Sequence, residues 1–247
     1  MTIEGAAVVF LAAVVTALAT GLGALPFAFD GRGVGRWLGP ANAVASGVML
    51  GASASLLIEG IDRSGGRTVV GAIGGAVFVF VAYRLVGEHD ALTLGSLRGA
   101  DATKALLIVG VMTAHSAAEG IGVGASFGDG ETFGLLIAAA IAVQNIPEGL
   151  AISLVLIPRG TRVRTGAGWS IFSSLPQPLL ALPAFVFVEQ FQAVLPIGLG
   201  FAAGAMMWMV GRELLPDAFH QGPRRAVLAG VLVSFVLMLA LQLVLAA

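Results

Sequence analysis

The sequence of 247 residues contains no cysteine, only three histidines and few charged residues. Without cysteine the chain can form neither a disulfide framework nor a thiolate metal site. Any bound metal must therefore be held by imidazole, carboxylate, amide or hydroxyl groups. Charged residues make up 11% of the chain and hydrophobic residues 57%, whereas a soluble domain has about 25% charged residues. So much apolar surface cannot be covered in a water-soluble fold, and the sequence predicts an integral membrane protein.

Other absences narrow the function further. The net charge is −1, which argues against nucleic acid as a partner. The chain has no Gly-x-x-x-x-Gly-Lys-Ser/Thr motif, so ATP binding of that type is not expected. It begins Met-Thr-Ile-Glu without a basic segment, and we therefore expect a retained first helix and not a cleaved signal peptide.

Eight apolar runs approach the length of about 20 residues that a membrane-spanning helix needs. Their approximate ranges are 5–29, 37–59, 67–86, 104–127, 132–157, 165–188, 191–211 and 224–246. The longest connection, about 87–103, is too short for a separate soluble domain. The predicted fold class is an all-α integral membrane protein with eight transmembrane helices, which form a single domain over residues 1–247.

The basic residues predict the orientation of these helices. Eleven of the thirteen lysines and arginines follow the odd-numbered runs, and only Arg63 and Arg67 follow an even-numbered one. Loops with an excess of Lys and Arg face the cytoplasm. The odd-numbered loops are therefore predicted to face the cytoplasm and both termini to lie outside.

Two runs contain a polar pair at helical spacing. His115 precedes Glu119 in the fourth run and Gln144 precedes Glu148 in the fifth, four residues apart in each case. Residues i and i+4 lie on one face of a helix. Each pair also lies about eleven or twelve residues from the end of its run, near the bilayer centre at 1.5 Å per residue. Because the two helices are antiparallel, the pairs are predicted to meet at one depth.

A carboxylate in the middle of a membrane helix is expensive and predicts a functional site. Two neighbouring glutamates would repel each other, and a divalent cation between them removes that repulsion. One imidazole nitrogen with three oxygens suits zinc, iron, manganese or cadmium. A proton relay is the alternative for the glutamates. Interhelical hydrogen bonding is the alternative for Ser116, Asn145 and Gln177, and Pro147 predicts an opening of the fifth helix beside the site.

These residues resemble the ZIP family, the Zrt/Irt-like transporters of zinc and iron. The resemblance lies in His115-Ser-x-x-Glu119-Gly and in Gln144-Asn-Ile-Pro-Glu148-Gly, the second in the form of the prokaryotic branch. Segments near Gly47-Val-Met, Leu56-Leu-Ile-Glu59, Gly204-Ala-Met and Glu213-Leu-Leu-Pro-Asp217 also match. The resemblance implies eight helices in a 3+2+3 arrangement and a binuclear metal centre.

By this resemblance His115, Glu119, Gln144 and Glu148 form the first, transport metal site. The second site corresponds to Ser116, Asn145 and Gln177 together with the two glutamates. Many family members have a glutamate where this chain has Gln177, and Ser116 replaces a usual asparagine. The second site is therefore predicted to bind metal weakly or not at all.

The predicted function is transport of a divalent metal, zinc before iron, manganese or cadmium, from outside to the cytoplasm across the cell (plasma) membrane. On the outer side the metal would pass Glu59, Asp62, Asp129 or Glu131. On the inner side it would leave along Glu213, Asp217 and His220. Beside this exit path, Arg212 stands where the family often has a histidine or an acidic residue. The chain is predicted not to be an enzyme. A degenerate metal-binding sensor and an intramembrane metalloenzyme are the alternatives. The partners expected are the metal ion and the lipid bilayer, with a homodimer as one assembly to test.

Overall fold

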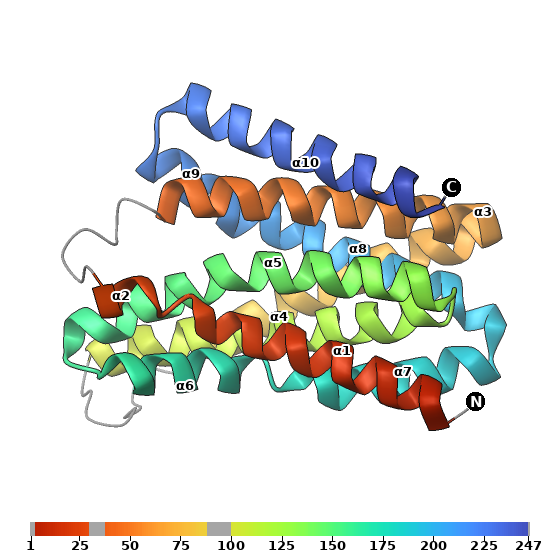
Figure 1. Cartoon of the computed structure of the whole chain (residues 1–247), viewed down its shortest axis with the longest axis horizontal. Helices are drawn as coiled ribbons and strands as arrows, with labels where there is room; N and C mark the ends of the chain where they lie inside the picture. Colours follow the sequence, from red (N-terminus) through yellow and green to blue (C-terminus); the bar gives the residue numbers. More distant parts are fainter. Residues whose placement is uncertain (1–2, 30–37, 88–99, 247) are drawn as a thin grey trace.

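The computed structural model of the chain describes residues 3–29, 38–87 and 100–246 (Figure 1). The longer elements in chain order are α1 (Ile3–Leu22), α3 (Leu38–Gly87), α4 (Ala100–Phe127), α5 (Glu131–Leu156), α6 (Val163–Ser173), α7 (Pro176–Gln190), α8 (Leu195–Met209) and α10 (Arg224–Ala246). Short segments connect them: α2 (Pro26–Phe29), η2 (Ile157–Arg159), η3 (Gln192–Val194), η4 (Val210–Leu214) and α9 (Leu215–Gln221). The described residues are helical almost throughout, as predicted.

Among the described residues, six helical segments are long and apolar enough to cross a membrane. One of them, Gly39–Arg84, has 46 residues and covers two of the predicted runs. The backbone leaves the helical region inside it at Ser64, with φ −167° and ψ 98°. Helix α3 therefore has two halves, and the second half returns beside α8 (Figure 1). The apolar helical fold is confirmed, whereas the number of eight spans stays a prediction.

The helices associate in two groups. Helix α1 packs on α5, α6 and α7, and α4 packs on α5 and α7. Helix α3 packs mainly on α8 and α10, which lie with it on the other side of the molecule (Figure 1). Helix α1 thus associates with the helices of the fourth to sixth runs, and the 3+2+3 arrangement stays a prediction. The reason for this association lies in the small and hydroxyl side chains that α1 buries, among them Ala13, Thr16, Ala17 and Thr20.

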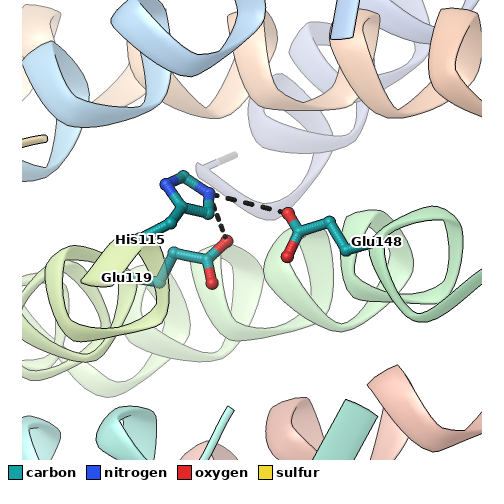
Figure 2. Close-up of side chains that lie close together, drawn as sticks. All are labelled: His115, Glu119 and Glu148. Atoms are coloured by element: carbon teal, nitrogen blue, oxygen red, sulfur yellow. Dashed lines mark ion pairs between the residues drawn. The ribbon is translucent and has the colours of Figure 1, made fainter. Parts of the chain in front are cut away.

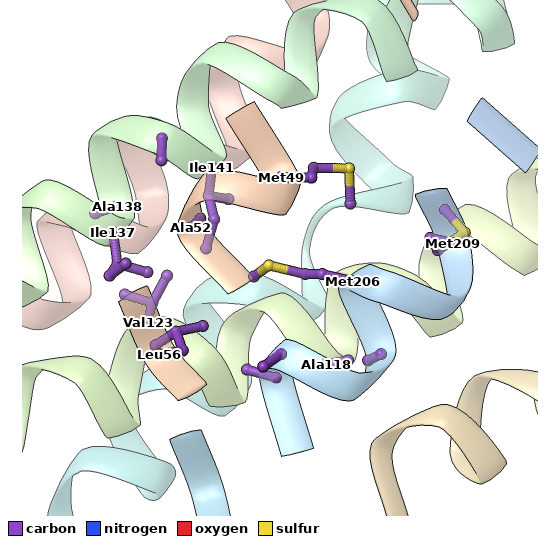
Figure 3. Packing of buried hydrophobic residues seen from close by; sticks show 14 of the residues in the cluster. Met49, Ala52, Leu56, Ala118, Val123, Ile137, Ala138, Ile141, Met206 and Met209 are labelled. Carbon is purple, nitrogen blue, oxygen red and sulfur yellow. The ribbon is translucent and has the colours of Figure 1, made fainter. Parts of the chain in front are cut away.

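An apolar cluster fills the space between the two groups (Figure 3). It includes Met49, Ala52 and Leu56 of α3, Val123 of α4, Ile137 and Ile141 of α5, and Met206 of α8. By contrast, the outward side of α10 exposes large apolar side chains, with Leu232 and Leu237 each 63% and Val244 73% accessible. Such a surface fits contact with lipid tails.

Helix α1 begins, and α10 ends, at one end of the molecule, where the turn between α4 and α5 also lies (Figure 1). The loop residue His89 lies outside the described residues. Helices α4 and α5 run antiparallel between this end and the other. Their central residues consequently face each other at one level, and this pairing positions the candidate site.

Candidate metal centre

Three buried side chains converge between α4 and α5. His115 Nε2 lies 3.3 Å from Glu119 Oε1 and 3.6 Å from Glu148 Oε1 (Figure 2). One ligand atom from each of the three residues lies within 4.8 Å of the other two, and no side chain of the three is more than 1% exposed. The i, i+4 spacing on α4 and the antiparallel course of α5 produce this meeting, as the sequence predicted. Imidazole nitrogen and carboxylate oxygen are the ligand types that zinc takes.

Many polar atoms at this place have no hydrogen-bond partner. They are both ring nitrogens of His115, Glu148 Oε1, Gln144 Oε1, Asn145 Oδ1 and Ser116 Oγ. Buried polar atoms in proteins are nearly always hydrogen-bonded, so a cluster of unpaired ones requires an explanation. Most of these atoms can donate a lone pair. A cation is the ligand that such a set of buried acceptors fits.

Gln144 reaches the centre from α5, one turn before Glu148. Its amide Nε2 donates a hydrogen bond to Glu119 Oε1. Its oxygen Oε1 has no partner and is fully buried. The Gln144 amide thus links α5 to α4, and its oxygen is available to bind a metal, as the prediction of the first metal site requires.

On the other side of Glu119 the amide of Gln177 is hydrogen-bonded at both ends, while Ser116 Oγ and Asn145 Oδ1 have no partner. Gln177 Nε2 of α7 donates to Glu119 Oε2 at 2.6 Å. Gln177 Oε1 lies 2.6 Å from the hydroxyl of Thr16 and 3.1 Å from Asn145 Nδ2. Asn145 Nδ2 also donates to the backbone oxygen of Thr16 at 2.8 Å. We call Thr16, Asn145 and Gln177 the amide clasp, because together they hold Glu119 by one of its oxygens.

Two glycines let the helices approach closely enough for this contact. A Cβ atom at Gly120 would lie 2.8 Å from Gln177 Cα, and one at Gly149 would lie 1.7 Å from the backbone oxygen of Thr20. Neither position can hold a side chain without movement of the facing backbone. Gly120 therefore brings α4 against the start of α7, and Gly149 brings α5 against α1.

The helix that carries Gln177 is interrupted beside the centre. Helix α6 ends at Ser173, and α7 begins at Pro176, whose ring suits the first turn of a helix. The prediction that Pro147 opens the fifth helix is wrong, since α5 continues as one helix from Glu131 to Leu156. Membrane helices tolerate proline where neighbouring groups compensate for the lost hydrogen bond. The interruption near the centre lies in the sixth run, not the fifth.

The predicted exit residues lie on the segment that follows α8. Glu213 belongs to the π-helical segment η4, and its Oε1 is buried and unpaired. Asp217 and His220 follow on α9 and are exposed, as is Arg212. A π-helical turn within a helix is rare and frequently lies at a functional site. Along this segment Glu213 is half-buried, whereas Arg212, Asp217 and His220 are exposed.

The predicted outer residues lie at the opposite end of the helices. Arg63 forms ion pairs with Asp129 and, at 3.1 Å, with Glu59. Asp62 and Glu131 are exposed. Arg63 belongs to α3 and Asp129 to the turn between α4 and α5, so this ion pair connects the two helix groups. Two of the four predicted acidic residues are therefore paired with an arginine.

Sequence reasoning missed Thr16 and the role of Arg63. Thr16 lies on α1, far from the motifs in the sequence, and its partners are Gln177 and Asn145. A sequence signal existed, because Thr16 and Thr20 are hydroxyl residues spaced i, i+4 in an apolar run. That signal predicts a polar helix face, but it does not reveal which helix the face contacts.

Comparison with known proteins gives a consistent result. The family model of the ZIP zinc transporters matches residues 87–242. The zinc transporter GufA of Myxococcus xanthus is 33% identical over 248 residues, which cover 94% of this chain and 97% of that protein. The zinc transporter ZIPB of Bordetella bronchiseptica is 32% identical over 213 residues, which cover 80% of this chain and 68% of that protein.

A longer relative is more similar. The Arabidopsis thaliana protein At3g08650 is 46% identical over 229 residues, which cover 92% of this chain but 37% of that protein. The chain therefore spans little more than a third of this relative. The matches to GufA and to the family model each include the residues of the centre.

Proposed function

Because this chain belongs to the ZIP family, we propose that it transports zinc through the centre between α4 and α5. The observation that carries the proposal is the set of unpaired buried atoms on His115, Gln144 and Glu148. These residues, together with Glu119, are the proposed ligands of the first metal site. Family members are transporters and not enzymes, so the alternative of an intramembrane metalloenzyme is set aside.

The charge of the centre supports a divalent cation as cargo. Glu119 and Glu148 are both buried, and each has one oxygen within reach of the other and of His115. One divalent cation balances the two carboxylate charges, whereas a monovalent cation would leave one charge buried. The ligand atoms are hard or intermediate, which fits zinc and allows iron, manganese and cadmium. A site without thiolate holds zinc less firmly than a Cys₄ site, as a cargo site requires.

We propose inward movement across the cell membrane by eight spans with both termini outside. Three members of the apolar cluster, Val123 of α4 and Ile137 and Ile141 of α5, lie between the centre and the end that holds the α4–α5 turn. On the other side the centre is followed by Glu213, which is partly buried, and by Asp217 and His220, which are exposed. This asymmetry supports a form that is closed to the outside, from which the ion leaves along η4 and α9. A homodimer is compatible with this arrangement and is tested by the mass of the purified protein.

Zinc uptake into proteoliposomes tests the proposal. Glu119→Ala and Glu148→Ala each remove a charged ligand of a buried ion, and we expect uptake to fall about 100-fold or more. Ser126→Ala is the matched control, since Ser126 is a buried polar residue of α4 whose hydroxyl donates to Val123 O of the same helix. Its uptake should equal that of the native chain. If both glutamate variants transport zinc, iron and manganese at the native rate, the proposal is wrong.

A further inference from the structure

We propose that the amide clasp takes the place of a second cation, so that the centre binds a single divalent ion. The inference rests on the proposed function and deepens it. Its principal residue is Thr16 of α1, which belongs to neither motif. In this view Gln177 is a positioning residue for Glu119, and Thr16 and Asn145 fix the orientation of its amide.

The hydrogen bonds determine which end of the Gln177 side chain faces Glu119. Its oxygen receives Asn145 Nδ2 at 3.1 Å and lies 2.6 Å from Thr16 Oγ1. The reverse orientation would place an NH₂ group against the NH₂ of Asn145 and an oxygen against the Glu119 carboxylate, with two repulsive contacts. Gln177 therefore presents N–H, which donates to Glu119 Oε2 at 2.6 Å. An amide NH₂ cannot bind a cation.

The orientation of Asn145 is fixed in turn by a backbone atom. Asn145 Nδ2 donates to the carbonyl oxygen of Thr16 at 2.8 Å and uses its other proton for Gln177. The single proton of the Thr16 hydroxyl has two acceptors, Gln177 Oε1 and Ala13 O, the latter at 2.7 Å. The two donors thus hold the Gln177 oxygen away from the centre. Every side chain of the clasp is at most 1% exposed, so water does not compete for these bonds.

The charge balance leads to the same conclusion. On the clasp side, a second cation would find Ser116 Oγ and Asn145 Oδ1, both neutral, besides the carboxylates that the first ion already uses. Two divalent cations against two carboxylates would leave a buried charge of about +2, which is strongly unfavourable. The N–H group of Gln177 already supplies a positive partner for Glu119 Oε2. The clasp therefore performs electrostatically part of what a second ion would do.

Equilibrium zinc titration of the purified full-length protein in detergent, with bound metal measured by mass spectrometry, tests this inference. The native chain should bind one zinc per chain. Gln177→Glu places a carboxylate oxygen opposite Glu119, while Thr16 and Asn145 can still donate to its other oxygen. Two facing carboxylates need a cation between them, so this variant should bind two zinc ions.

The role of Thr16 is tested separately, by measuring the Kd of the single zinc ion. Thr16→Val removes the hydroxyl but keeps the backbone acceptor of Asn145, and Kd should rise about five- to tenfold, as expected for one lost hydrogen bond. Thr16→Ser should restore the native Kd within about twofold. Thr20→Val is the matched control, because Thr20 also lies buried on α1 and its hydroxyl contacts Ser174 Oγ at 2.7 Å, away from the clasp.

The outcomes separate the clasp from the proposed function. Two zinc ions of similar affinity on the native chain, or one ion on Gln177→Glu, would overturn the clasp and leave zinc transport intact. Equal Kd values for Thr16→Val and Thr20→Val would overturn the role of Thr16. Failure of the native chain to bind any zinc at micromolar concentration would instead overturn the proposed function.

Discussion

The two sides of Glu119 differ in how far their polar atoms are paired within the protein. Towards His115 and Glu148, both ring nitrogens of His115, Gln144 Oε1 and Glu148 Oε1 lack hydrogen-bond partners. Towards Thr16 and Gln177, the Gln177 amide is hydrogen-bonded at both ends, although Asn145 Oδ1 and Ser116 Oγ lack partners. Both sides are equally buried and both include amide groups, and the first also has the imidazole of His115. The comparison teaches that residue type and depth do not by themselves define a metal site in a membrane. The unpaired lone pairs define it.

The largest expected effect comes from neutralising the unpaired side. Glu148→Gln should weaken zinc binding by about 100-fold or more, because the variant has a single carboxylate for a divalent ion. The same change removes the repulsion between two buried carboxylates. The metal-free variant should therefore unfold at a temperature about 2–4 °C above the native midpoint. Titration and thermal unfolding in the presence of a chelator measure the two effects.

A variant Glu148→Gln that lost zinc and also unfolded at a lower temperature would show that Glu148 has a structural role without metal. That result would remove the proposed difference between the two sides of Glu119.

An intermediate effect is expected from separating α4 from α7. Gly120→Ala places a Cβ 2.8 Å from Gln177 Cα, so the backbones must move apart and the bond from Gln177 to Glu119 must lengthen. We expect a loss of about 1–3 kcal/mol in the free energy of unfolding, the usual result of overpacking. Zinc should bind more weakly, but by less than in Glu148→Gln.

The matched control for Gly120→Ala is Gly168→Ala. Gly168 is a helical glycine of α6, and a Cβ there would meet no atom within 4 Å. This variant should be as stable as the native chain or slightly more stable, because alanine favours a helix over glycine. Equal losses of stability in the two variants would show that the contact of α4 with α7 is not tight.

The smallest effect is expected at the outer ion pair. Arg63→Gln removes the contacts with Glu59 and Asp129, and the Arg63 side chain is 40% exposed. The pair with Glu59 is partly exposed at both ends and contributes about 0.2–1 kcal/mol, whereas the Asp129 side chain is 7% exposed. The unfolding midpoint should fall by no more than about 2–4 °C, and less at high salt, while zinc affinity stays native. A change in zinc Kd would mean that the outer end is coupled to the centre.

Local periodicity was sufficient to predict one side of the centre. The spacing of His115 with Glu119, and of Gln144 with Glu148, follows from helix geometry alone. The antiparallel order of the two runs then predicts that both pairs meet. The structure brings these residues together, and the metal that they would bind stays a prediction.

The other side depended on contacts between distant helices. Thr16 and Gln177 are 161 residues apart, and no local pattern indicates that α1 packs on α7. Helix order along the chain does not determine packing order, so the contacts of α1 with α5, α6 and α7 could not be predicted. Pro147 was a misleading signal because α5 continues through it, while Pro176 marks the start of a helix after an actual interruption.

The central claim is that one zinc ion binds between α4 and α5 on the unpaired side of Glu119. Anomalous diffraction from crystals of the zinc-loaded native chain tests it most directly. We predict one strong peak in contact with His115 Nε2, Glu119 and Glu148, and no peak of comparable height beside Gln177. A second peak of similar height next to Gln177, or a single peak away from His115, would contradict this account.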